Sequence, residues 1–233
     1  MTTNKSPSAG CKGILLINKS AGSTSFQIVR QLRRLLHVEK IGHAGTLDPF
    51  ATGVMVMLVG REFTRLSNEF LGSDKEYHAL VHLGVQTDSY DIDGTITAQS
   101  DLIPSLDQIH TALMAFQGQV SQIPPMFSAK KVGGQKLYDL ARKGIEIERQ
   151  PVTVQMKTTL IHYEYPNLEL HIHCSKGTYI RSLAHDLGQM LGCGGHLSAL
   201  TRLKSGPYHL EECLSQEVLQ QPGIDLQPHL RSI

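Results

Sequence analysis

The 233-residue sequence contains no tryptophan, and phenylalanine and tyrosine bring its aromatic content to only 6%. No apolar run approaches the length of a membrane span, and the Ser- and Lys-containing start lacks the apolar core of a secretory signal. We therefore expect neither a membrane protein nor a secreted one, and place the chain in the cytoplasm. Apolar content of 40% with 18% charged residues is typical of a globular protein.

Cysteine is scarce, and its spacing matters more than its number. The chain has no Cys-x-x-Cys pair, which argues against a zinc site and against a disulfide framework. The twelve histidines raise the question of another metal site. His78 and His82, like His171 and His173, share one face of a predicted strand, but neither pair has a third ligand at a recognisable spacing. We predict partly exposed strand histidines and no metal.

Positive charge is absent from residues 76–129, which contain six acidic residues and neither lysine nor arginine. Because the whole chain has a net charge of +1, the remainder carries +7. This division of charge is typical of a protein that binds phosphates with a basic face and has an acidic face elsewhere. The basic residues cluster at Lys12, Lys19, Arg30, Arg33, Arg34 and Lys40, at Lys130, Lys131, Lys136, Arg142 and Lys143, and at Lys176, Arg181, Arg202 and Lys204. For Arg30, Arg33 and Arg34 taken alone, an ordinary solvated helix surface is the favoured interpretation.

Residues 42–53 (GHAGTLDPFATG) hold a single carboxylate, Asp48, among three glycines and a proline. Such a stretch forms neither a regular helix nor a central strand. The apolar run 54–59 (VMVMLV) that follows predicts a buried strand. A rigid loop that presents one acid, with His43 and Thr46 beside it, indicates catalysis. The alternative is a turn in which Asp48 caps backbone amides, and the motif by itself favours that alternative.

The remaining pattern predicts an α+β fold with a mixed, largely antiparallel sheet. Expected strands cover residues 13–18, 76–84 and 95–98, with two or three more between 145 and 174. Expected helices follow caps at residues 23–25 and at Ser105, and cover 62–71, 136–143 and 178–191. Residues 91–94 read as a turn, and 123–135 as a long loop.

Several blocks resemble, in order and spacing, the TruB family of synthases that convert a T-loop uridine of tRNA to pseudouridine. GHAGTLDPFATG is similar to the family's signature loop, and GILLINKSAGSTS (13–25) to its Lys-Pro element, with Ser20 in place of the proline. Further matches are DKEYHALVHLGVQTDSYDIDG (74–94), IPPMFSAKKVGGQKLYDLARKGIEIER (123–149), HCSKGTYIRSLAHDLG (173–188) and GCGGHLSALTRLKSGPY (192–208). The resemblance implies the pseudouridine-synthase fold, a central mixed sheet flanked by helices with an active-site cleft.

The resemblance also implies roles for individual residues. Asp48 matches the essential aspartate, Tyr77 the active-site tyrosine, and Arg181 the residue that supplies a positive charge to the carboxylate. The positions implied to bind substrate are His43, which supports the RNA around the extruded nucleotide, Tyr179 and Leu200, which line the base pocket, and Lys19 of the Lys-Pro element. For Tyr179 and Leu200, core packing is the interpretation that the residues alone favour.

The implied reaction breaks the N1–C1′ bond of a flipped-out uridine, turns the base and rejoins it through C5, which requires no cofactor. Asp48 acts either as a nucleophile on C1′ or by assisting C2′ deprotonation toward a glycal, and both routes remain open. A non-catalytic RNA-binding or tRNA-folding protein on the same fold is the alternative, and the presence of the acid, tyrosine and arginine disfavours it. A nucleoside or glycoside hydrolase is disfavoured because the loop offers one carboxylate rather than two.

We expect a flexible N-terminus (1–12), a catalytic domain (13–210) and a short, amphipathic C-terminal tail (211–233) without the PUA-type domain of many bacterial relatives. The expected partner is the T-arm of tRNA, bound by a monomer without a guide RNA. Lys130 and Lys131 are weaker candidates for phosphate contacts.

Overall fold

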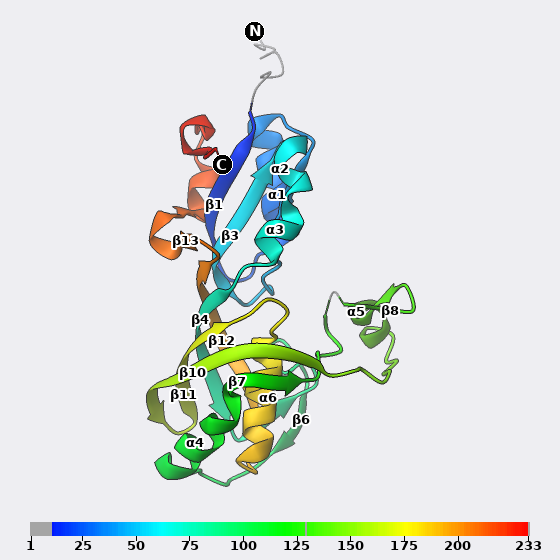
Figure 1. Cartoon of the computed structure of the whole chain (residues 1–233), viewed down its shortest axis with the longest axis vertical. Helices are drawn as coiled ribbons and strands as arrows, with labels where there is room; N and C mark the ends of the chain where they lie inside the picture. Colours follow the sequence, from blue (N-terminus) through cyan, green and yellow to red (C-terminus); the bar gives the residue numbers. More distant parts are fainter. Residues whose placement is uncertain (1–10, 129, 233) are drawn as a thin grey trace. The chain divides into compact units, whose positions relative to one another are not determined.

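The computed structural model describes residues 11–128 and 130–232, so the predicted flexible N-terminus lies almost entirely outside the described residues. The chain forms two compact units (Figure 1). The first unit contains residues 11–76 and 201–232, and the second unit contains residues 77–200. Within the described residues, no helix is long and apolar enough to cross a membrane.

The first unit is built on a mixed sheet with the strand order β14-β1-β3-β12. Strand β1 pairs antiparallel with β3 and parallel with β14, and the end of β12 pairs parallel with the start of β3. The elements that begin in this unit are β1 (Gly13–Lys19), α1 (Ser25–Leu36), β2 (Ile41–His43), β3 (Thr52–Val59), α2 (Arg61–Arg65), α3 (Ser67–Leu71), β13 (Tyr208–His209), η2 (Leu210–Glu212), β14 (Leu214–Ser215), η3 (Gln216–Gln220) and η4 (Gln227–His229).

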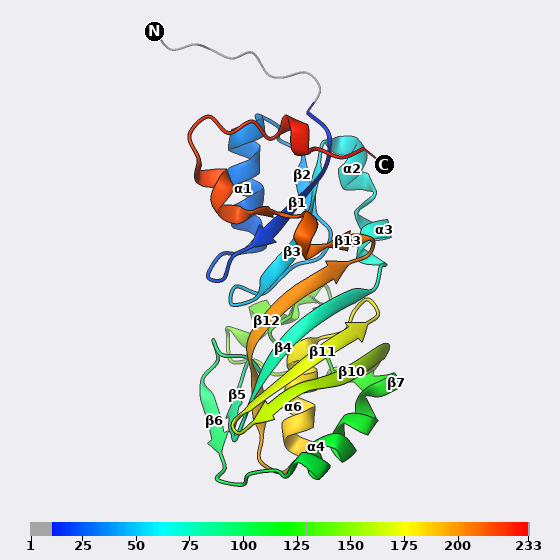
Figure 2. The same ribbon diagram turned by 90° about the vertical axis from the view of Figure 1, so that its left-hand side faces the viewer.

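Strands β1 and β3 are apolar on both faces because each face is covered by helices (Figure 2). Helix α1 lies on one face, where its residues Ile28 and Leu32 are fully buried and the Ser25 hydroxyl lies 3.7 Å from the Met55 sulfur. Phe63 and Phe70, from α2 and α3, pack on the opposite face. The predicted strands at residues 13–18 and 54–59 and the capped helix between them in the sequence are confirmed, with Thr24 as the N-cap of α1.

The second unit has the strand order β12-β4-β11-β10-β7, and β10 pairs antiparallel with both neighbours. Two small hairpins, β5-β6 and β8-β9, complete its strands. The elements are β4 (Lys75–Leu83), β5 (Val85–Thr87), β6 (Ile96–Gln99), α4 (Leu106–Leu113), η1 (Met114–Phe116), β7 (Gln117–Gln122), β8 (Lys131–Val132), β9 (Gln135–Lys136), α5 (Leu137–Ala141), β10 (Val152–Glu164), β11 (Asn167–Cys174), α6 (Ile180–Met190) and β12 (Gly195–Ser205).

Strand β4 alternates between buried and half-buried residues, as expected for a strand with one face on the core. His78 and His82 both lie on its half-buried face, which confirms the interpretation of partly exposed strand histidines. Helix α6, which lies within the helix predicted over 178–191, runs along one side of this sheet (Figure 2), and its apolar residues Leu183 and Leu187 are buried. The predicted α+β class with a mixed, largely antiparallel sheet is confirmed.

Several local predictions were wrong. The helix expected over 62–71 is two short helices that break at Leu66, and the loop expected over 123–135 contains the β8-β9 hairpin. Strands β5 and β7 were not predicted, because their polar residues lack a strand pattern. No strand was predicted in the C-terminal segment, but Leu214 lies in β14 and pairs with Ile17 of β1. That segment packs into the first unit, with Leu219 and Leu226 buried.

Gly53 is a position where the first unit tolerates no side chain. Its φ is +104°, and a Cβ added there would lie 2.3 Å from the backbone oxygen of Arg202 on the paired strand. Gly223→Ala supplies a control, since Gly223 also has a positive φ, of +73°, but nothing within 4 Å. We expect Gly223→Ala to cost about 1–2 kcal/mol and Gly53→Ala about 1–3 kcal/mol more, measured by urea denaturation. Equal losses would contradict the close approach.

Candidate active site

Asp48 lies half-buried in the loop that joins β2 to β3, and both of its neighbours in the chain are tethered. The Ser25 hydroxyl donates to the Leu47 carbonyl at 3.2 Å and accepts from the Leu47 amide at 3.1 Å. The Pro49 carbonyl accepts hydrogen bonds from the Gly22 amide at 2.9 Å and from the Lys19 ammonium at 3.0 Å. The carboxylate is thus presented by a loop that is fixed on either side of it.

Arg202 holds the first half of the same loop from inside the unit. Its side chain is 1% exposed, and its Nε donates to the Val54 carbonyl at 2.7 Å. Its Nη2 donates to the Gly45 carbonyl at 3.2 Å. The prediction that Arg202 belongs to a phosphate-binding cluster is wrong, because its guanidinium is buried and bound to backbone carbonyls. An arginine within an otherwise strand-like segment, LTRLKS, was the sequence signal for this role.

Lys19 is fully buried, and its ammonium donates to the Ser20 and Pro49 carbonyls, each at 3.0 Å. Burial lowers the pKa of Lys19 to about 8; the nearby charge of Asp48 raises it, and that of Arg202 lowers it further. A contact of this ammonium with phosphates, as its cluster predicted, does not fit its burial. The side chain links β1 to the Asp48 loop, whether or not a proline follows it.

His43 ends β2, at the start of the loop. Burial lowers the pKa of its imidazole, and the charge of Arg202 lowers it further. Its Nδ1 is buried without a hydrogen-bond partner among the described residues. The ring is therefore neutral at pH 7, a state that suits an aromatic ring for stacking rather than a cation for phosphate binding.

Arg181 stands in the first turn of α6 in the second unit and is 5% exposed. Its guanidinium donates to the Ser89 carbonyl at 3.1 Å and to the Phe127 carbonyl at 2.7 Å, and lies 3.3 Å from a carboxylate oxygen of Asp91. Asp91 is itself buried and also accepts from the Asp93 amide at 3.1 Å. The sequence identified Asp91 only as part of a turn, and its ion pair with Arg181 was missed.

The other predicted site residues also lie in the second unit. Tyr77 in β4 and Leu200 in β12 are 8% and 7% exposed. Tyr179 precedes α6, and its backbone is fixed by the Gln122 side chain, which accepts from the Tyr179 amide at 2.8 Å and donates to its carbonyl at 2.9 Å. Gln122 is 1% exposed and was not singled out in the sequence, because a glutamine in a polar strand carries no signal. The roles implied for these residues stay predictions.

No group of three or more histidine, cysteine, aspartate or glutamate side chains within residues 11–128 and 130–232 is placed to hold a metal ion. His78 lies 3.3 Å from Glu169, and the rings of His82 and His196 are 5.2 Å apart, so each of these histidines has one neighbour of this kind. The first is a partly exposed pair on the sheet, and the second joins the half-buried His82 to the buried His196.

Comparisons with known proteins cover nearly the whole chain. Residues 33–180 match the TruB family pseudouridylate synthase (N terminal domain), and residues 181–225 match the tRNA pseudouridylate synthase B C-terminal domain. A tRNA pseudouridine synthase B of Protochlamydia amoebophila is 63% identical over 90% of this chain and 80% of its own length. That of Chlamydia pneumoniae is 57% identical over 94% of both chains.

Solved structures give the same fold. A chain of a Cbf5-Nop10-Gar1 complex aligns with a TM-score of 0.71 at 27% identity, over 93% of this chain. A chain in a structure of an H/ACA RNP bound to a substrate RNA containing 2′-deoxyuridine aligns with a TM-score of 0.67 at 26% identity. The present chain spans 58% and 57% of the lengths of these two chains.

The buried ammonium of Lys19 predicts a specific pH dependence of stability. Because its pKa falls from 10.5 in the unfolded chain to about 8 in the fold, the cost of burying its charge is full below pH 8 and is relieved as the pH rises toward 10.5. The free energy of unfolding, relative to Lys19→Met, should therefore rise by about 3 kcal/mol across this range. Lys12→Met is the control. It removes an exposed ammonium 2.9 Å from Glu62 and shows how a surface lysine changes the free energy of unfolding over the same pH range. Parallel curves for the protein and Lys19→Met would refute the expectation.

Asp91→Asn tests the ion pair in the second unit. Removal of one charge from a buried pair leaves the Arg181 guanidinium without its compensation, and such losses cost roughly 3–5 kcal/mol. Asp93→Asn makes the same chemical change two residues away at an exposed carboxylate and should cost less than about 0.5 kcal/mol. Thermal and urea unfolding of both variants gives the comparison, and similar stabilities would show that the pair contributes little.

Proposed function

We propose that this chain, which belongs to the TruB family of pseudouridylate synthases, is an enzyme that isomerises a uridine of tRNA to pseudouridine. Relatives named tRNA pseudouridine synthase B match it over 90% or more of its length. The observation that carries the proposal is the loop around Asp48, in which a single carboxylate is held by tethers on both sides. Such preorganisation is what a catalytic group requires.

The reaction cleaves the N1–C1′ bond, rotates the detached uracil and forms a C5–C1′ bond, after which the C5 proton is lost and N1 gains one. The starting and final nucleotides are isomers, so no oxidant, reductant or energy source enters the balance. Asp48 is the proposed catalytic group. Nucleophilic attack on C1′ and assistance to C2′ deprotonation both require an ionised carboxylate at a fixed position, and both routes fit the tethered loop.

Two buried cations support that assignment from within the first unit. Lys19 binds the Pro49 carbonyl, next to Asp48, and Arg202 binds the Gly45 carbonyl three residues before it. Their charges favour an anion in this loop, since charges in a poorly solvated interior interact more strongly than charges in water. We therefore assign both residues to the positioning of Asp48 rather than to phosphate contacts.

The residues of the second unit complete the proposal. Arg181 is proposed to supply positive charge during the reaction, with its guanidinium oriented by Asp91 and by the Ser89 and Phe127 carbonyls. Tyr77 is proposed to stack on the target base and to take part in proton transfer. Tyr179 and Leu200 are proposed to line the base pocket.

We propose that the target is the T-loop uridine at position 55, extruded from the RNA, with the neutral ring of His43 supporting the nucleotides around it. The T-arm is the proposed binding element, and the protein is proposed to act as a monomer without a guide RNA. Support for independence from a guide comes from the degree of similarity. Relatives named tRNA pseudouridine synthase B are 46–63% identical, whereas the chains from H/ACA complexes are 26–27% identical.

Asp48→Asn tests the catalytic assignment, because it keeps the size of the side chain and removes its charge. We expect pseudouridine formation in an unmodified tRNA transcript to fall by at least about 10⁴-fold, roughly 5.4 kcal/mol, while the Kd for tRNA stays within threefold. Asp225→Asn, at an exposed carboxylate of the same unit, is the matched control. Mapping of the modified nucleotide at the same time checks its position. Near-normal turnover by Asp48→Asn would refute the proposal, and no turnover by the unchanged protein would favour a tRNA-folding role.

A further inference from the structure

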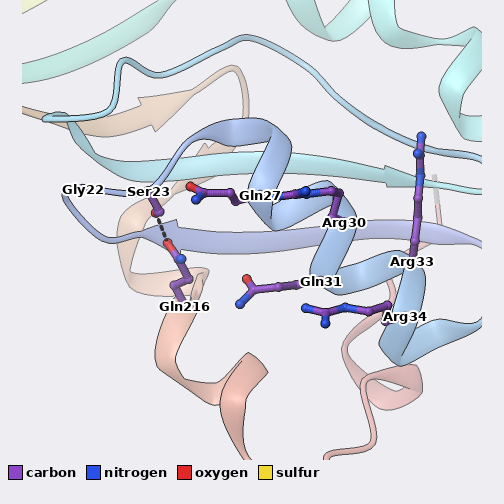
Figure 3. Close-up of a pocket in the computed structure, with 8 residues that line it drawn as sticks. All are labelled: Gly22, Ser23, Gln27, Arg30, Gln31, Arg33, Arg34 and Gln216. Atoms are coloured by element: carbon purple, nitrogen blue, oxygen red, sulfur yellow. Dashed lines mark hydrogen bonds between the residues drawn. The ribbon is translucent and has the colours of Figure 1, made fainter.

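One arginine-lined pocket of the first unit has no part in the proposed chemistry. It has a volume of about 640 Å³, in the range of ligand-binding sites, and its wall contains no acidic residue. The lining residues are Gly22, Ser23, Gln27, Arg30, Gln31, Arg33, Arg34 and Gln216. All are drawn in Figure 3, where Arg30, Gln31 and Arg34 extend from the same side of α1 and Arg33 projects away from them.

Arg30 and Arg34 lie one helical turn apart, so their charges repel each other on the same face. Neither forms an ion pair with an acidic side chain among the described residues, and α1 itself carries three arginines and no acid. The C-terminal end of the helix dipole stabilises Arg33 and Arg34 in the last turn, but Arg30 lies outside that turn. An ordinary solvated helix face therefore does not account for the pair. An anion between the two guanidinium groups would remove their repulsion.

The pocket also holds oriented polar groups. The Gln216 Oε1 accepts from the Ser20 amide at 2.9 Å and from the Ser23 hydroxyl at 2.8 Å. These two bonds fix the amide, so that its Nε2 is left as a donor at the pocket wall. The guanidinium of Arg30 is restrained as well, because it lies over the Phe26 ring at 5.8 Å. Donors with restricted orientations bind an anion at a lower entropic cost than mobile ones.

An RNA strand supplies such anions. Each backbone phosphate carries a negative charge, and arginine side chains are common partners of these phosphates.

We infer that this pocket binds the sugar-phosphate backbone of the RNA substrate, with Arg30 and Arg34 on phosphates. The pocket is a second RNA contact, separate from the loop that carries Asp48, and it acts on affinity. The inference rests on the proposed function in one respect, namely that the phosphates belong to a tRNA substrate.

The test compares two double variants that remove the same charge at the same spacing. Arg30→Ala with Arg34→Ala removes two cations from the pocket. Arg61→Ala with Arg65→Ala removes two exposed cations, also four residues apart, from α2. The Kd for an unmodified tRNA transcript is measured by filter binding between 50 and 300 mM KCl. The pocket variant should bind at least about tenfold more weakly at 100 mM, with a salt slope reduced by about two, and the α2 variant within twofold of the unchanged protein.

Further arms separate the possible failures. Arg30→Lys with Arg34→Lys should recover most of the salt slope, which excludes a folding defect as the cause. A Kd and slope for the pocket variant equal to those of the α2 variant would overturn the inference. A second outcome would also overturn the inference: 10 mM inorganic phosphate raises the Tm only when both arginines are present, while RNA binding does not depend on them. Pseudouridine formation by the unchanged protein is scored in the same RNA. If it is absent while binding still depends on the two arginines, the proposed function fails and the pocket assignment stands.

Discussion

The buried guanidinium of Arg202 is the interaction on which the rest of the first unit depends. The loop after β2 has no sheet partner for its carbonyl groups, and unpaired carbonyls inside a protein are costly. Arg202 supplies donors to the Gly45 and Val54 carbonyls at once, and it is carried by a strand that passes directly against Gly53. The Gly45 and Val54 carbonyls therefore have hydrogen-bond donors, as the carbonyls of paired strands do.

Both units bury a cation, but they compensate the charge in different ways. In the second unit, Arg181 faces the carboxylate of Asp91 at 3.3 Å. In the first unit, Lys19 and Arg202 donate to backbone carbonyls, and burial lowers the pKa of Lys19 although the charge of Asp48 raises it. Buried positive charge in the wall of a loop is destabilising by itself and becomes favourable when an anionic group such as Asp48 sits in that loop. The pattern is what one expects where stability is given up for function.

The regular elements could be predicted because their periodicity is local. The apolar run of β3, the stripe of α1 and the alternation of β4 each come from neighbours in the chain. The structural roles of Arg202, Asp91 and Gln122 could not be predicted, since their partners are fixed by contacts that the sequence does not reveal: Val54 is 148 residues away from Arg202, and Ser89 is 92 residues away from Arg181. The roles that motif resemblance implies for Asp48 and Arg181 stay predictions. For Lys19 it implied a substrate contact, whereas the structure buries the ammonium against the Ser20 and Pro49 carbonyls.

The first unit is discontinuous in the chain, and this has a consequence for its synthesis. The Ser20 amide is bonded to Gln216, and β1 is paired with β14, so these contacts of the earliest strand form only after residues 214–216 have left the ribosome. The second unit, formed by residues 77–200, is complete before that moment. Arg202 also emerges after it. A nascent chain therefore carries the Asp48 loop with its tethers to Lys19, Gly22 and Ser25 but without the bonds from Arg202, and the loop acquires its full set of hydrogen bonds only after residue 202 has emerged.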